Sequence, residues 1–337
     1  MNRSIRFAKH PHGMPDAQCF EFTQEDLPSP GPDEVLIENH LLSVDPYIRM
    51  RMEQEDSYAP AMRIGEVIVG RTIGRVIQSN DARLGLGSWV LGRHAWQLYS
   101  LAKPDELQVI DPEHAPLGAY LGALGSTGQT AWLGFHLIGK PKAGETVVVS
   151  AAAGAVGSVA CQLAKRLGCH TIGIAGGQRK CEWVKTALGA DECLDYQSAD
   201  FKASLAVRLH DGIDFYFDNV AGSILDHLLL HMNMHARVAL CGLVSQYNAT
   251  SPDGIFNLRA LFNKRVRLQA FLLSDHKGLL AQASADLLIA FRDGQLRHEE
   301  TIYEGLDQAP LAFVDMLQGK NLGKQLVRLR DSSGQAL

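Results

Sequence analysis

The fold of this chain is decided by one stretch, Val147-Val148-Val149-Ser150-Ala151-Ala152-Ala153-Gly154-Ala155-Val156-Gly157-Ser158-Val159-Ala160. Three successive valines are typical of a buried strand, and the small residues after them turn the chain into a helix predicted over residues 159–167. A strand, a glycine turn and a helix begin a dinucleotide-binding unit, in which Ala152, Gly154 and Gly157 take the three glycine positions. The same pattern also occurs in tight turns of other α/β proteins, so the next segment is needed to distinguish a dinucleotide-binding turn from an ordinary one.

That next segment favours NADP(H) over NAD(H). His170–Ala175 is predicted to be the following parallel strand, and an NAD-binding unit carries Asp or Glu at its end, roughly 20 residues past the glycines. Here the strand leads into Gly176-Gly177-Gln178-Arg179-Lys180, with two cations and no carboxylate. A cation attracts the 2′-phosphate that a carboxylate repels. The alternative is that Arg179 and Lys180 simply begin a solvated helix.

Composition limits the class of protein. The chain has 337 residues, 46% of them hydrophobic and 20% charged, which predicts a folded protein of two domains. A net charge of −5 argues against nucleic acid or an anionic membrane as a partner. We find neither an apolar run that could span a bilayer nor a signal peptide. The six cysteines include no pair at zinc or redox spacing, so we expect reduced, mostly buried thiols and a cytoplasmic protein.

Two kinds of strand pattern divide the chain. Residues 1–123 are rich in short strands bounded by glycine, at 34–44, 65–78 and 87–92, and they predict a β-barrel-like domain. From residue 124 to about 300, strands alternate with helices, which predicts a doubly wound parallel sheet. Its clearest strands are 145–149, His170–Ala175, 214–217 and 238–241. A helix at Ala309–Leu317 and a strand at 324–329 follow, and that strand could return to the first domain.

Several ordered motifs support a family resemblance over nearly the whole chain. They are the 151–157 turn, Ala175-Gly176-Gly177, Leu42-Ser43-Val44-Asp45-Pro46-Tyr47-Ile48-Arg49, Tyr216-Phe217-Asp218-Asn219-Val220, Cys241-Gly242-Leu243-Val244-Ser245-Gln246-Tyr247-Asn248 and Asn321-Leu322-Gly323-Lys324. The chain resembles the medium-chain dehydrogenase/reductase superfamily. Within it, the chain is similar to the zinc-independent branch of prostaglandin/leukotriene and double-bond reductases, which includes the bacterial NADPH-dependent curcumin reductases. The resemblance implies a GroES-like domain of residues 1–123, completed by 301–337, and a Rossmann domain of residues 124–300.

The positions that bind zinc in related alcohol dehydrogenases hold other residues here. The corresponding stretches read Val44-Asp45-Pro46-Tyr47 and Gly70-Arg71-Thr72, and the four-cysteine loop is absent. Since catalytic zinc needs three protein ligands, we predict no metal. His227, His231 and His235 are four residues apart and would line one helix face, which we interpret as a solvated face.

Without zinc, the predicted chemistry is hydride delivery to the β-carbon of an α,β-unsaturated ketone or aldehyde. The resulting enolate needs a hydrogen-bond donor and its α-carbon needs a proton, and a tyrosine hydroxyl suits both needs. The resemblance points to Tyr247 for this role, with Tyr47 and Tyr58 near the substrate as further candidates. The alternatives are a packed tyrosine at a domain junction for Tyr247, core packing for Tyr47, and a mobile surface loop for Tyr58.

The resemblance also implies which residues contact the cofactor, NADPH or NADP+. They are Ala152, Ala153, Gly154, Ala155, Val156, Gly157, Gly177, Lys180, Tyr196, Asn219, Cys241, Gly242, Ser245, Tyr247, Phe271, Leu272, Leu273 and Asn321. Structural alternatives stay open for three: a helix cap for Asn219, a core strand for Phe271–Leu273 and a turn for Asn321. Gln129 and Trp132 depart from close relatives in a loop that approaches the nicotinamide, so substrate preference could differ there.

The predicted function is therefore NADPH-dependent reduction of the conjugated C=C bond of small-molecule enones and enals. The alternatives are an NADPH:quinone oxidoreductase and a non-catalytic NADPH-binding protein. The resemblance further implies a homodimer. In relatives the strand near residues 265–271 joins two sheets edge to edge, and an uncovered edge strand invites such pairing.

Overall fold

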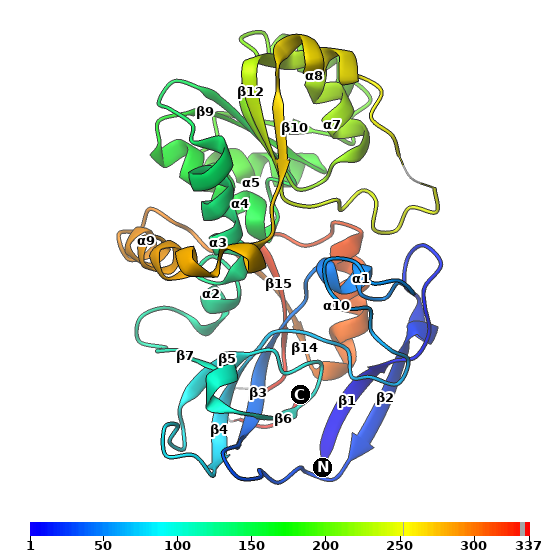
Figure 1. The fold of residues 1–337 in the computed structure, drawn as a ribbon, viewed down its shortest axis with the longest axis vertical. Helices are drawn as coiled ribbons and strands as arrows, with labels where there is room; N and C mark the ends of the chain where they lie inside the picture. The colour runs from blue at the N-terminus through cyan, green and yellow to red at the C-terminus, as the bar shows by residue number, and fades with distance from the viewer. Residues whose placement is uncertain (252, 331–333) are drawn as a thin grey trace. The chain divides into compact units, whose positions relative to one another are not determined.

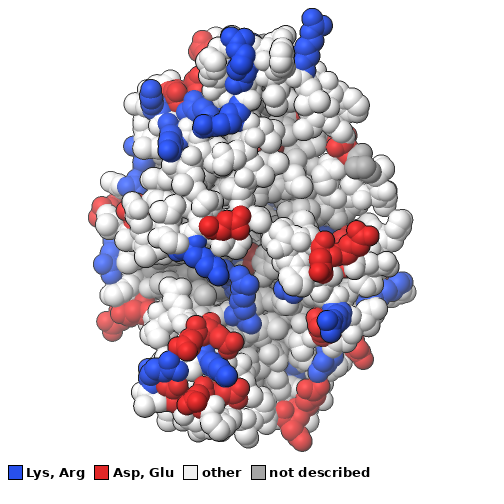
Figure 2. Space-filling model, viewed as in Figure 1, with Lys and Arg blue, Asp and Glu red and all other residues white. Residues whose placement is uncertain are grey.

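The computed structural model describes residues 1–251, 253–330 and 334–337, and the chain divides into two compact units. Unit 1 comprises Met1–Leu121 and Glu300–Leu337, and unit 2 comprises Gly122–Glu299. Within the described part of the chain, no helix combines the length and apolar character needed to span a lipid bilayer. On the face drawn in Figure 2, basic and acidic side chains are interspersed, unlike the continuous basic surface typical of nucleic-acid-binding proteins.

Unit 2 is built on a six-stranded parallel sheet (Figure 1). Its strands, in spatial order, are β10 (Glu192–Asp195), β9 (His170–Ala175), β8 (Thr146–Ser150), β11 (Ile213–Asp218), β12 (Met232–Leu240) and β13 (Arg267–Ala270). The five residues of β8 are all buried, because helices cover both faces of a doubly wound sheet. This order, which reverses direction between β8 and β11, confirms the predicted Rossmann fold.

The helices of unit 2 connect these strands. They are α3 (Ser126–Leu133), the π-helix η3 (Gly134–Gly139), α4 (Ala155–Arg166), α5 (Gln178–Leu188), α6 (Phe201–Arg208), α7 (Gly222–Leu228), the 3-10 helix η4 (Leu229–His231), α8 (Leu258–Lys264), the 3-10 helix η5 (Leu273–Leu279) and α9 (Leu280–Arg292). Isoleucine, leucine and phenylalanine side chains from β9, α6, β11 and α7 form one buried cluster against the sheet.

Three sequence predictions for unit 2 need correction. The helix predicted over 159–167 begins at Ala155, because the chain becomes helical directly after Gly154. The strand predicted over 238–241 begins at Met232 and ends at Leu240. His227, His231 and His235 do not share a helix face, since α7 ends at Leu228 and His235 lies within β12.

Unit 1 holds a second, mostly antiparallel sheet. The strand order is β14 (Glu300–Glu304), β15 (Lys324–Arg328), β3 (Val35–Ser43), β4 (Thr72–Ser79), β5 (Trp89–Gly92) and β7 (Gln108–Val109), with β6 (Tyr99–Ala102) also pairing with β3. A separate pair is formed by β1 (Asn2–Phe7) and β2 (Phe20–Glu25). The C-terminal strand β15 is antiparallel to β3, and it follows α10 (Ala309–Leu317), whose bounds are those predicted.

The remaining short elements of unit 1 are η1 (Ala17–Cys19), α1 (Tyr47–Met50), η2 (Pro104–Glu106), α2 (Leu117–Leu121) and η6 (Leu306–Gln308). The strand predicted over 65–78 is wrong for its first half, since β4 begins at Thr72. Gly65 has a φ of 89°, which excludes it from an extended strand, and Val67 makes only an isolated bridge with Arg6.

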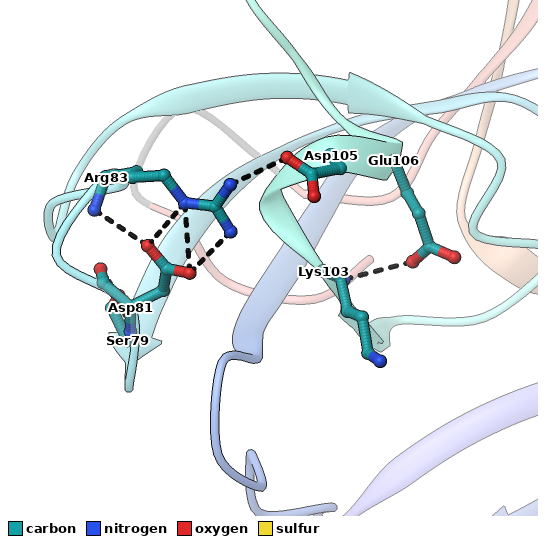
Figure 3. A network of polar contacts seen from close by, with 6 residues as sticks. All are labelled: Ser79, Asp81, Arg83, Lys103, Asp105 and Glu106. Carbon is teal, nitrogen blue, oxygen red and sulfur yellow. Dashed lines mark hydrogen bonds and ion pairs between the residues drawn. The ribbon is translucent and has the colours of Figure 1, made fainter.

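An exposed polar network ties two loops of unit 1 together (Figure 3). The Arg83 guanidinium pairs with Asp81 at 2.8 Å and with Asp105 at 2.7 Å, and the Glu106 carboxylate accepts a hydrogen bond from the Lys103 backbone N–H. Pairs at such exposed positions contribute little to stability. The single positive charge of the Arg83 guanidinium thus has two acidic partners.

Candidate functional site

The candidate site lies where the strand order of unit 2 reverses, at the carboxyl ends of β8 and β11. Ser150, the last residue of β8, donates from Oγ to Asp218 Oδ1 at 2.9 Å and accepts from the Asn219 backbone N–H at 2.9 Å. The Asn219 side-chain amide donates to the Ser150 carbonyl oxygen at 2.7 Å. Ligands of doubly wound sheets bind outside such a reversal point, so these bonds hold in place the strand ends that face the ligand.

The glycine turn after β8 leaves the start of α4 open to an anion. Gly154 occupies the N-cap and provides no side chain to bind the first N–H groups of the helix, those of Ala155, Val156 and Gly157. A Cβ at Gly157 would lie 2.2 Å from the Ala151 carbonyl oxygen, so α4 packs against the turn at a distance that only glycine permits. Free N–H groups and the positive end of the helix dipole form a cradle that fits a pyrophosphate.

Ala152 replaces the first glycine of the fingerprint, and the neighbouring strand compensates for it. Its side chain is fully buried. A Cβ at Gly173 of β9 would lie 2.9 Å from the Ala152 Cβ. The methyl group therefore occupies space that glycine leaves in β9, and Ala153 beside it is also buried.

A second turn, between β9 and α5, gathers the residues predicted at the 2′-phosphate. Gly177 caps α5 with a φ of 86°, and its N–H donates to the Asp195 carboxylate at 2.8 Å. The Tyr196 hydroxyl lies 3.0 Å from where a Cβ of Gly176 would stand. Lys180 lies in the first turn of α5, where burial and then Arg179 lower the pKa of its amine. Arg179 and Lys180 lie at the positive end of the α5 dipole, which repels them, so the turn favours an anionic ligand.

Tyr247 lies in the loop that follows β12 and folds back onto the end of that strand. Its hydroxyl accepts a hydrogen bond from the Leu243 N–H at 3.4 Å. It lies 3.6 Å from the Cβ position of Gly242, which in turn is 3.1 Å from the Asn219 carbonyl oxygen. Burial raises the pKa of Tyr247, so the hydroxyl is neutral at physiological pH. The structure thus brings Tyr247, Gly242 and Asn219 together.

Two further residues predicted to contact the cofactor, Ser245 and Cys241, lie in the same loop. Ser245 Oγ donates to the Val220 carbonyl oxygen at 2.6 Å, which holds the loop after β12 against the loop after β11. Cys241 directly follows β12, and burial raises the pKa of its thiol to about 12, so that it remains protonated. Cys241 can line a site and does not act as a nucleophile there.

The other predicted residues have different surroundings. The Phe271 side chain is buried and packs on Phe217 with ring centroids 6.3 Å apart, whereas Leu272 and Leu273 are half-buried after β13. Asn321 belongs to unit 1, where its amide donates to the Gly323 carbonyl oxygen at 2.9 Å in the turn before β15.

The two remaining tyrosine candidates also belong to unit 1. Tyr47 begins α1 and is half-buried, whereas the Tyr58 side chain is 50% exposed. Burial raises the pKa of Tyr47 to about 12. The Tyr47 hydroxyl can therefore donate a proton at neutral pH.

Gln129 and Trp132 bind another helix. Gln129 Nε2 donates to Ser284 Oγ at 2.8 Å, and Trp132 Nε1 donates to Asp286 Oδ2 at 2.9 Å. Both partners lie on α9, so these two side chains hold α3 against α9.

Sequence reasoning missed the buried carboxylate of Asp218. Its Oδ1 accepts hydrogen bonds from Tyr216 Oη at 2.7 Å and from the N–H groups of Val220 and Ala221, both at 2.9 Å. Burial raises its pKa, and within the described residues its Oδ2 has no hydrogen-bond partner. Asp218 therefore shapes the turn that presents Asn219. The sequence signal that could have identified Asp218 is an acidic residue at the end of a predicted strand, directly before Asn219.

The described part of the chain was predicted to hold no metal, and the structure gives the placement of its possible ligands. Among residues 1–251, 253–330 and 334–337, no three His, Cys, Asp or Glu side chains are placed to hold a metal ion. Asp45, in the stretch 44–47, accepts hydrogen bonds from Lys324 Nζ at 2.9 Å and Ser43 Oγ at 2.5 Å.

Comparisons with known proteins find relatives along most of the chain. Residues 3–110 match the family model of the N-terminal domain of oxidoreductases, and residues 155–288 match that of the zinc-binding dehydrogenases. The chain is 40% identical to the NADPH-dependent curcumin reductase of Escherichia coli over 334 residues, 97% of each chain. It is 40% identical to the NADP(+)-dependent 2-alkenal reductase of Nicotiana tabacum over 300 residues, 88% of each chain.

A solved structure is similar over the same length. CurA from Vibrio vulnificus in complex with NADPH is 42% identical, with a TM-score of 0.93 over 98% of this chain and 99% of that one. The cradle at α4 and the cationic turn at α5 are thus found in a chain whose whole fold matches that of a protein crystallised with NADPH.

Proposed function

Because the chain belongs to the medium-chain dehydrogenase/reductase family, in the branch that includes the curcumin reductases, we propose that it reduces the conjugated C=C bond of α,β-unsaturated ketones and aldehydes with NADPH. The observation that carries the proposal is the junction of an anion cradle at α4 with a neutral tyrosine hydroxyl beside Asn219. The first fits a dinucleotide, and the second fits a substrate that develops negative charge on oxygen.

The residues that would hold the cofactor follow from the site. The N–H groups of Ala155, Val156 and Gly157 would bind the pyrophosphate, and Lys180 with Tyr196 would bind the 2′-phosphate end. Bound NADPH supplies a hydride. Ser150 and Asp218 hold Asn219 in place for the nicotinamide half.

Tyr247 is proposed to bind the carbonyl oxygen of the substrate. Its hydroxyl accepts from Leu243 in the structure, so its own proton is left to donate. Donation to an oxygen that becomes an enolate stabilises the transition state more than the ground state, which is the condition for catalysis. The same proton can pass to the α-carbon, and the raised pKa keeps it on the hydroxyl until then.

The test is NADPH consumption with a simple enone, followed by identification of the product, for the wild type and Tyr247→Phe. A saturated ketone is expected, and the variant is expected to lose roughly a hundredfold in kcat, because one donor to the developing oxyanion is removed. Tyr120→Phe is the matched control, because its hydroxyl bonds the Asp111 carbonyl oxygen in unit 1. An allylic alcohol as the product would overturn reduction of the C=C bond.

The same assay separates the alternatives. Turnover of quinones without turnover of enones would assign the chain to quinone reduction, which uses the same hydride donor. Tight NADPH binding without turnover of either class would favour a non-catalytic NADPH-binding protein. The role of Tyr247 itself would be contradicted if Tyr247→Phe and Tyr120→Phe retained equal activity.

We propose further that two copies of the chain pair through β13. This strand ends the six-stranded order, and Arg267, Gln269 and Ala270 on it are exposed. On the preceding helix α8 the Phe262 side chain is 78% exposed. An uncovered edge beside an exposed phenylalanine favours pairing of the same strand from a second copy.

Light scattering after size exclusion tests this pairing. The wild type is expected at about twice the chain mass of 36.8 kDa. Gln269→Lys is expected to shift it toward the monomer, because like charges meet across a two-fold edge. Gln295→Lys, at an exposed position after α9, is the control that should keep the mass. A monomeric wild type at micromolar concentration would contradict the proposal.

A further inference from the structure

Two cysteines lie in the layer between α5 and the β10 edge of the unit 2 sheet. Cys193 in β10 pairs with Gly173 of β9, and its Sγ lies 3.2 Å from where a Cβ of Gly173 would stand. Val184 of α5 reaches the same position, with its Cγ1 at 2.8 Å. Cys181 is buried one helical turn before Val184, so both side chains belong to the face of α5 that covers these strands.

The two thiols contact each other. The Cys181 thiol donates to the Ala175 carbonyl oxygen at 3.9 Å, which places it at the end of β9. A hydrogen bond joins the side chains of Cys181 and Cys193, and it lowers the pKa of Cys181 while it raises that of Cys193. Cys181 is therefore the thiol of this pair that more readily becomes a thiolate, which is the reactive form.

The pair differs from the neighbouring cysteine of α4. Burial alone raises the pKa of Cys161 to about 12, so its thiol stays protonated and unreactive. Cys193 is half-buried, so a molecule as small as hydrogen peroxide can reach the pair from solvent. All six cysteines are free thiols in the structure, which is thus the reduced form of the protein.

We propose that hydrogen peroxide oxidises Cys181 and Cys193 to a reversible disulfide, and that this disulfide weakens NADPH binding at the neighbouring turn. The Cys181 thiolate attacks one peroxide oxygen, the O–O bond breaks, and a sulfenic acid and one water form. The Cys193 sulfur then displaces the sulfenic hydroxyl group as a second water, and the S–S bond forms. The two thiols thus lose two electrons, and the peroxide is reduced to two waters.

The disulfide cross-links the two elements that hold the turn before α5. Lys180 directly precedes Cys181 on the helix. The Gly177 N–H at the start of the same helix donates to Asp195, two residues after Cys193. Because an S–S bond is only about 2 Å long, the sulfurs approach each other and the first turn of α5 moves with them. The effect on NADPH rests on the proposed role of Lys180 at the 2′-phosphate, whereas the disulfide does not.

Peptide mapping of the full chain tests the disulfide. After stoichiometric hydrogen peroxide, the number of free thiols under denaturing conditions is expected to fall from six by two, and dithiothreitol should restore both. Trypsin cleaves after lysine, so the two cysteines fall in separate peptides, residues 181–185 and 186–202, which the disulfide joins. An unchanged thiol count, or a cross-link between other cysteines, would overturn the proposal.

Cofactor titration tests the effect on the turn. The oxidised wild type is expected to bind NADPH about tenfold more weakly than the reduced protein, because a hydrogen bond to a charged group is lost. Binding of NADH, which has no 2′-phosphate, should change by less than about threefold. By linkage, saturating NADP+ should raise the reduction potential of the disulfide by about 30 mV, since a tenfold preference for the dithiol form corresponds to that shift.

Variants separate the disulfide from the role of Lys180. Cys181→Ser, which lacks the reactive thiol, should bind NADPH equally before and after peroxide treatment. Cys161→Ala, in the same unit, is the control that should keep the full response. A disulfide that leaves NADPH affinity unchanged would contradict its link to the turn. Equal affinity of the reduced protein for NADPH and NADH would overturn the role of Lys180, while the joined peptides would still support the disulfide.

Discussion

Replacing Gly157 with alanine is expected to destabilise unit 2 by about 3 kcal/mol and to abolish NADPH binding. The new Cβ would stand 2.2 Å from the Ala151 carbonyl oxygen and 2.9 Å from the Ala152 Cα. Both are backbone atoms, which cannot turn away as a side chain would, so α4 must move off the turn. The N–H groups that form the anion cradle move with it. Thermal unfolding and NADPH titration measure the two effects.

Gly278→Ala is the matched control, because no atom lies within 4 Å of its Cβ position. It belongs to the same unit and is expected to keep both the melting temperature and the affinity for NADPH. The expected drop for Gly157→Ala is roughly 5–10 °C. If Gly157→Ala melted with the wild type and bound NADPH equally well, the close approach of α4 to the turn would not be what forms the cradle.

The sequence predicts the sheet of unit 2 well because its signals are local. Three valines fully buried in β8 and the small residues after them specify a strand and a turn without help from distant residues. The helix start at Ala155 was missed because alanine, valine and glycine carry no capping signal there. The position became helical through packing of α4 on the turn, a tertiary effect.

The site was predictable only in part. Glycine positions and the missing acid after β9 are visible in the sequence, and they indicate a phosphate cradle. The buried network around Asp218 is not visible, because Ser150 and Asp218 are 68 residues apart and meet only when β8 and β11 pair. The four-residue spacing of His227, His231 and His235 predicts one helix face, but His235 lies in the strand β12.

Replacing Lys180 with alanine is expected to lower kcat/KM for NADPH by about tenfold to a hundredfold, the loss of a hydrogen bond to a charged group. Activity with NADH should stay within about threefold of the wild type, because NADH has no 2′-phosphate for Lys180 to bind. The reason lies in the turn before α5. There Lys180 lies near Arg179 at the positive end of the helix. A bound anion therefore relieves the repulsion between the two cations and between the cations and the helix dipole.

Lys185→Ala is the control from the same helix. Its amine pairs with Glu182 at 2.8 Å near the other end of α5, away from the turn, and the variant should leave both cofactors unaffected. Lys180→Glu should shift the cofactor preference further from NADPH toward NADH. A carboxylate repels the 2′-phosphate of NADPH and accepts a hydrogen bond from the ribose hydroxyl of NADH. Equal losses with NADPH and NADH in Lys180→Ala would assign Lys180 to the folding of α5, and the choice of cofactor would then depend on Arg179 or Tyr196.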